Sequence, residues 1–101
     1  MTQRETELSK SIINIVSKEY NINLCSPVTD VKEAVDVASY MMKKHLRIKN
    51  VYIARILNRS MLSDFATKAM HNIEAKKKDK DFAKKLSSIE IKFLENADIW
   101  V

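Results

Sequence analysis

The polar side chains that best suit molecular recognition lie between residues 63 and 76. The residues expected to face a partner are Thr67, Lys68, His71 and Asn72, and Ser63 at the start of the segment is a further candidate contact. Their intervals of three and four residues predict one exposed face of a helix that begins near Ser63. Such groups can hydrogen-bond to base edges in the major groove of DNA. The alternative is that they form only the solvated side of the helix.

Basic residues surround this segment and could hold phosphates. They are Arg47, Lys49, Arg55, Arg59 and Lys76. The whole chain has a net charge of +5 and a pI near 9.4, which favours a polyanionic partner. Attraction of lysine and arginine to phosphate does not depend on base sequence. Ordinary surface charge is the competing interpretation of these residues.

The other reactive residue types form no recognisable catalytic or metal-binding set. His45 and His71 are far apart in the sequence and lack cysteine or carboxylate ligands at a typical spacing. Cys25 has an apolar neighbour and is expected to be a small core residue. Glu90 and Glu95 have no paired base. We therefore expect a protein that is not an enzyme and needs no metal or cofactor.

Composition indicates an all-α domain. The 101 residues contain no glycine and one proline, and 46% are hydrophobic. Glycine supplies the positive φ angles of tight hairpins and phosphate-binding loops, so its absence disfavours sheets and nucleotide-binding turns. The length and apolar content suit a single domain over residues 1–101. One cysteine and no apolar run of roughly 18 residues predict a cytoplasmic protein without a membrane span.

Five helices are predicted from apolar periodicity and capping residues. The expected segments are about 6–20, 29–46, 50–57, 60–75 and 79–96. The candidate N-caps are Thr29 or Asp30, Asn50, Ser60 or Ser63, and Asp79 or Asp81. The expected apolar faces include Ile12, Ile15, Val16, Val37, Ala38, Met41, Val51, Ile53, Leu57, Ala69, Ile73, Phe82, Leu86, Ile89, Phe93 and Leu94. Residues 50–76 then form a helix-turn-helix.

Several segments follow one family pattern. Residues 12–24, IINIVSKEYNINL, match a helix that ends in tyrosine before a short extended stretch. Residues 34–41, AVDVASYM, are similar to A-R-x-I-A-x-Y-L, and residues 53–57, IARIL, to I-G-x-x-F. The remaining matches are Ile73-Glu74 and Asp81-Phe82. Over about residues 8–94 the chain thus resembles the C-terminal DNA-binding domain of the bacterial replication initiator DnaA.

This resemblance implies a Trp-repressor-like helix-turn-helix fold and binding to double-stranded DNA, with a role in replication or transcription. Residues 60–65, SMLSDF, replace the family's G-x-R-D-H-T-T signature, and Val35 replaces its arginine. The basic loop before that helix is reduced to Lys32. A different DNA target is therefore implied. A free-standing, diverged copy of this domain is typical of a phage or mobile element.

The rival hypothesis is a protein-interaction module or inhibitor on the same fold. Loss of the family signature motivates it, together with apolar residues that could be exposed: Met61, Leu62, Ile99 and Trp100. Single helix-turn-helix domains often dimerise, but the sequence shows no sustained heptad seam that specifies a dimer. The oligomeric state and the partner stay open at this level.

Overall fold

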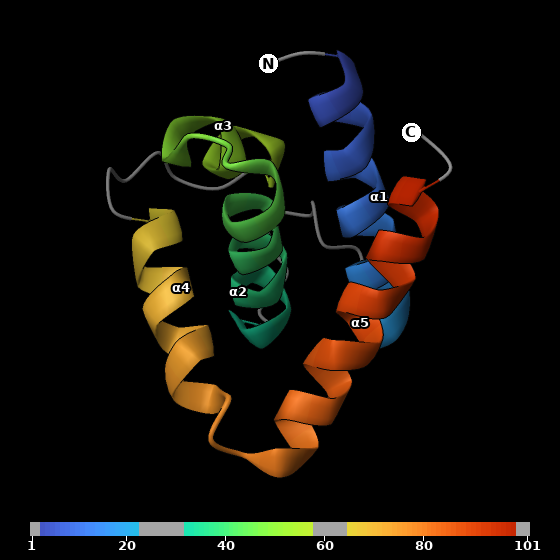
Figure 1. Cartoon of the computed structure of the whole chain (residues 1–101). Helices are drawn as coiled ribbons and strands as arrows, with labels where there is room; N and C mark the ends of the chain where they lie inside the picture. The colour runs from blue at the N-terminus through green and yellow to red at the C-terminus, as the bar shows by residue number, and fades with distance from the viewer. Residues whose placement is uncertain (1–2, 23–31, 58–64, 99–101) are drawn as a thin grey trace.

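The computed structural model describes residues 3–22, 32–57 and 65–98, and within these ranges it contains helices and no strand (Figure 1). The elements are α1 (Gln3–Tyr20), α2 (Lys32–Met41), a π-helical turn η1 (Met42–Leu46), α3 (Asn50–Ile56), α4 (Phe65–Lys76) and α5 (Lys80–Asp98). The predicted all-α class is confirmed. The helix-turn-helix stays a prediction, because the residues joining α3 to α4 lie outside the described ranges.

Helix α2 is the centre of the fold. Every side chain from Ala34 to Met42 is buried, and Tyr40, Met41 and Met42 are almost completely so. In Figure 1, α2 stands between α4 on one side and α1 with α5 on the other. Buried Ile12, Ile73 and Ile89 from these surrounding helices complete the core. A helix buried on all sides can fix the position of each neighbour relative to the others.

The second predicted helix reaches Leu46 as expected, but its last turn is wider than an α-helix. It ends at Arg47, which has a left-handed conformation with φ of 54°, and the Arg47 N–H donates to the Met42 carbonyl. Helix α1 ends in the same way at Asn21, also with φ of 54°. Glycine is the usual residue at such helix ends, so here asparagine and arginine adopt its conformation.

Two predicted helix starts can be compared with the structure. Asp79 is the N-cap of α5, because its Oδ1 accepts hydrogen bonds from the N–H groups of Asp81 (2.9 Å) and Phe82 (3.2 Å). The prediction for Asn50 is wrong: Lys49 occupies the N-cap of α3 without a side-chain hydrogen bond, and Asn50 is the first helical residue. The other candidate caps lie outside the described ranges: Thr29, Asp30, Ser60 and Ser63.

Most predicted core positions are buried, with three corrections. Val51 is 39% exposed and Leu94 is 47% exposed, while Ile15 is only partly buried. Each lies at the edge of its helix's apolar stripe, where sequence periodicity alone does not determine which neighbour covers it. In the described part of the chain, no helix combines the length and hydropathy needed to cross a membrane.

Candidate nucleic-acid interface

The outer face of α4 brings together three of the predicted base-contacting residues. Thr67, Lys68 and His71 are all exposed, and their spacing places them on one stripe of the helix. Glu74 and Ala75 continue the same exposed stripe one turn later. The stripe presents a hydroxyl, an ammonium and an imidazole, with no large apolar side chain among them. Its first two turns can therefore offer hydrogen bonds to a polar partner.

Asn72 was expected on that exposed face and Lys76 as a phosphate contact next to it, but both interact with α2. The Asn72 amide donates to Asp36 Oδ2 at 3.2 Å, and Lys76 Nζ lies 3.6 Å from Glu33 Oε1. The physical reason is helical geometry: Asn72 follows His71 by about 100° of rotation, far enough to face the neighbouring helix. Asn72 therefore connects α4 to α2 within the fold, and Lys76 forms an ion pair across the same interface.

The buried carboxylate that receives Asn72 is electrostatically unusual. Asp36 is only 6% exposed, and burial raises its pKa above the ordinary value for aspartate. The hydrogen bond from Asn72 opposes this shift, because it stabilises the charged carboxylate. Asn72 thus supplies a donor to a group that water reaches poorly.

A chain of side-chain hydrogen bonds connects the start of α4 to α3. Lys43 Nζ donates to Asn50 Oδ1 at 2.7 Å, and the Asn50 amide donates to Thr67 Oγ1 at 3.4 Å. This chain joins η1, α3 and the first helical turns of α4 that carry the outer stripe. Asn50 therefore orients one helix against the next instead of capping its own.

The cations near α3 occupy a different part of the surface. Arg47, Lys49 and Arg55 are exposed, and the guanidinium of Arg55 lies 6.0 Å from the centre of the Tyr52 ring. Arg47, Lys49 and Tyr52 also line a hollow of about 310 Å³, together with Ile48 and the acidic Glu5. Two further predicted site residues, Arg59 and Ser63, lie outside the described ranges.

The sequence around α3 is free of acidic residues. Between Val37 and Ser63 it contains six lysines or arginines and no aspartate or glutamate. Lys43 is one of the six, and its ammonium is engaged with Asn50. Carboxylates from other helices offset part of this positive charge, because Glu5 lines the hollow beside Arg47 and Lys49, and Glu90 pairs with Lys44.

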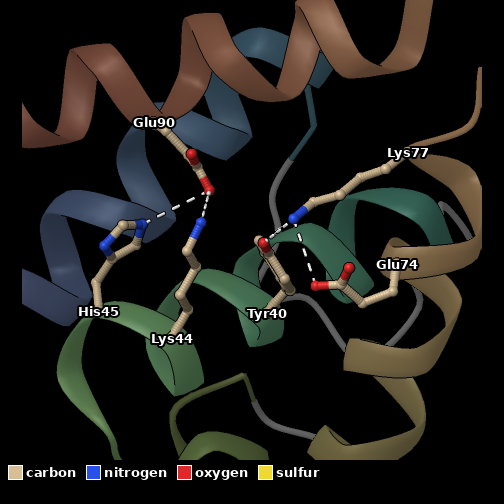
Figure 2. Close-up of polar contacts among 6 residues, drawn as sticks. All are labelled: Tyr40, Lys44, His45, Glu74, Lys77 and Glu90. Carbon is tan, nitrogen blue, oxygen red and sulfur yellow. Dashed lines mark hydrogen bonds and ion pairs between the residues drawn. The ribbon is translucent and has the colours of Figure 1, made fainter. Parts of the chain in front are cut away.

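The polar contacts in Figure 2 join neighbouring helices, and several of them lie at the surface. The Lys77 ammonium donates to the Tyr40 hydroxyl and lies 3.3 Å from Glu74 Oε1. Glu90 of α5 faces the end of α2, where its Oε1 lies 3.3 Å from Lys44 Nζ. Hydrogen bonding to Tyr40 raises the pKa of Lys77, so this ammonium stays charged. Lys77 thus links the end of α4 to Tyr40 of α2, and Lys44 links η1 to α5.

His45 belongs to the same group of contacts. Its ring packs 5.4 Å from that of Phe93, and its Nε2 lies 3.6 Å from Glu90 Oε1, too far for a hydrogen bond. This buried nitrogen has no hydrogen-bond partner within the described structure. Burial lowers the pKa of His45, outweighing the opposite effect of Glu90. The neutral imidazole is therefore the form that the fold favours.

Sequence reasoning missed Lys43, Asn50 and Tyr52 as residues that shape this surface. Only the tyrosine next to a cluster of cations gave a signal in advance, because aromatic rings are common partners of arginine. The contact of Asn50 with Thr67 spans 17 residues and depends on tertiary packing.

Among the described residues, no group of three or more His, Cys, Asp or Glu side chains is arranged to hold a metal ion.

Comparison with known proteins gives no family for this chain: no family model, no curated protein and no solved structure matches it.

Proposed function

We propose that this protein binds double-stranded DNA with the outer face of α4 in the major groove. The observation that carries the proposal is the exposed stripe of Thr67, Lys68 and His71, which Asn50 braces against α3. An α-helix fits the major groove, and these three side chains can donate to or accept from base edges there. Asn72 is given a positioning role instead, because its amide is engaged by Asp36.

Phosphate contacts are assigned to the cations in and just before α3, the helix that Asn50 links to the stripe through Thr67. Lys49 and Arg55 are exposed, and the sequence from residue 37 to residue 63 that contains them has no aspartate or glutamate, although Glu5 of α1 lines the hollow beside Lys49. Arg47 is assigned the same role. Its left-handed backbone conformation costs more free energy for arginine than for glycine, and a phosphate contact would account for the presence of arginine there. Arg59 of the joining segment is a further candidate from its sequence position. A DNA-binding protein of this kind would regulate replication or transcription by occupying a site.

The salt dependence of DNA binding tests the phosphate assignments. Each phosphate contact contributes about −0.9 to the slope of log K against log salt concentration. Lys49→Gln and Arg55→Gln should each make the slope shallower by about one unit, and the double variant by about two units. Fluorescence anisotropy with a labelled random-sequence duplex over a salt series measures these slopes.

The matched control is Lys10→Gln, which removes an equal charge from the exposed side of α1. It should leave the slope within experimental error of the original protein. Slopes that stay unchanged in the Lys49 and Arg55 variants would remove both residues from the phosphate contacts. An equal change in the control would show that only net charge matters.

A protein-interaction module is the second candidate, and exposed apolar residues favour it. Ile91 is 55% exposed and Leu94 is 47% exposed on α5. The four apolar residues that first suggested this hypothesis lie outside the described ranges: Met61, Leu62, Ile99 and Trp100. This function predicts DNA binding that is weak and indifferent to base sequence.

A further inference from the structure

One face of α5 is left uncovered by the rest of the described structure. Lys84, Ser87, Ile91 and Glu95 are all exposed and recur at intervals of three and four residues. Among the residues whose burial is described, Ile91 is the most exposed large apolar residue, at 55%, and Leu94 adjoins it at 47%. The opposite side of α5 buries Phe82, Leu86, Ile89 and Phe93 in the core. We name the exposed stripe Lys84, Ser87, Ile91 and Glu95 the α5 outer face.

The α5 outer face is hollowed where its side chains are small. A depression of about 630 Å³ lies along the helix, and its described lining includes Lys84, Ser87, Ser88, Ile91 and Glu95. The two serines lie between the long Lys84 and the branched Ile91. A projecting isoleucine next to a shallow notch is the arrangement by which side chains of one helix insert between those of another.

Charge is divided along this face. Lys84 lies at the N-terminal end of the α5 outer face, and Glu95 lies at its C-terminal end. Neither Lys84 nor Glu95 has an ion-pair partner among the described residues, whereas the neighbouring Lys92 is paired with Glu19 of α1 at 3.1 Å. A second copy of the same helix, running in the opposite direction, would bring unlike charges together at both ends.

We propose that the α5 outer face pairs with the same face of a second copy of this chain, with the two helices antiparallel. A two-fold axis near residues 89 and 90 places Ile91 of each copy at the Ser87–Ser88 notch of the other. The same axis places Lys84 of each copy against Glu95 of the other, because both pairs are symmetric about that point. Each of these contacts then occurs twice, once on either side of the axis, as an isologous dimer requires.

Dimerisation through α5 does not depend on DNA binding, because α5 lies on the other side of α2 from α4 (Figure 1).

A single helix face is smaller than the usual interface of about 1,600 Å², so the pairing should be weak, with a dissociation constant on the order of 10–100 μM. Sedimentation equilibrium of the purified full chain without DNA, from low to high micromolar concentration, should therefore follow a monomer–dimer equilibrium.

Charge exchange tests the antiparallel arrangement. Lys84→Glu alone and Glu95→Lys alone each place like charges opposite one another at both ends of the contact, and each should weaken the dimer at least tenfold. The double variant, Lys84→Glu with Glu95→Lys, should restore most of the lost association. Raising the salt concentration should reduce these differences, because the paired groups are partly exposed.

Ile91→Ser tests the apolar part of the contact and should abolish measurable association. Lys10→Glu on α1 is the control, and it should dimerise like the original protein. All of these positions are exposed, so thermal melts by circular dichroism should show the fold intact. A chain that stays monomeric up to high micromolar concentration would overturn the proposal. Failure of the double variant to regain association would overturn it as well.

Discussion

At the scale of single residues, the polar side chains predicted on α4 have two different environments: three are exposed, and Asn72 contacts α2. The spacing of Thr67, Lys68 and His71 was enough to predict their common exposed face. The role of Asn72 could not be predicted from sequence, since its partner Asp36 lies 36 residues earlier on another helix. The periodicity of the sequence predicts the direction in which a side chain leaves its helix. The packing of the helices determines which residue that side chain contacts.

These two roles predict that substitutions at neighbouring positions of α4 change the free energy of unfolding by different amounts. Asn72→Ala should lower the free energy of unfolding by about 1–3 kcal/mol, because it leaves the buried Asp36 without its donor. His71→Ala, its matched control, should change stability by less than about 0.5 kcal/mol, since His71 is exposed. Urea denaturation measures both values. Equal effects in the two variants would contradict the positioning role of Asn72.

His45 predicts a loss of stability in mild acid. Its pKa in the folded protein lies below its ordinary value of 6.5, so the unfolded chain takes up a proton first as the pH falls. The free energy of unfolding should therefore decrease as the pH falls from about 7 toward the lowered pKa of the folded state, and not recover below it. Urea denaturation of the original protein and of His45→Gln over this range measures the effect. The prediction fails if both proteins lose stability equally.

At the scale of elements, local signals predicted helices well and their ends less well. Asp79 was recognisable as a cap because its own side chain accepts the bonds that define the helix start. Asn50 has the same chemistry, yet its side chain is occupied by Lys43 and Thr67, so Lys49 takes the cap position instead. The wide turn of η1, which follows α2, begins at the fully buried Met42, and its apolar periodicity did not distinguish it from an α-helical turn.

The left-handed end of η1 gives a prediction that connects stability with binding. Arg47→Gly should raise the free energy of unfolding by up to about 1 kcal/mol, because glycine has no Cβ to disfavour positive φ. DNA affinity at low salt should fall at the same time, since a phosphate-binding cation is lost. Urea denaturation and anisotropy titration measure the two effects.

The control for this variant is Asn21→Gly at the end of α1, where φ has the same value. Asparagine tolerates the left-handed region better than arginine does, so the gain in stability should be smaller there. DNA affinity should not change in the control. A stabilised Arg47→Gly protein with undiminished affinity would show that Arg47 does not touch phosphate.

At the scale of the whole molecule, composition was the strongest predictor. The absence of glycine and the helical periodicity were enough to predict the all-α class, which the structure confirms. The direction of each exposed face was beyond sequence analysis, because it depends on how α2 separates α4 from α1 and α5. The proposed DNA-binding surface on α4 and the proposed dimer surface on α5 therefore lie on different sides of α2. The two surfaces can be disabled separately by substitution.

The most direct test of DNA recognition is the ratio of affinities for a duplex enriched by selection and for random duplexes, at physiological salt. Anisotropy titrations with the original protein should give a ratio of about a thousand or more, as sequence-specific DNA-binding proteins do. Lys68→Ala with His71→Ala should reduce that ratio while leaving binding to random DNA much less affected. Equal, feeble affinity for both duplexes in the original protein would contradict the account and favour the protein-interaction module.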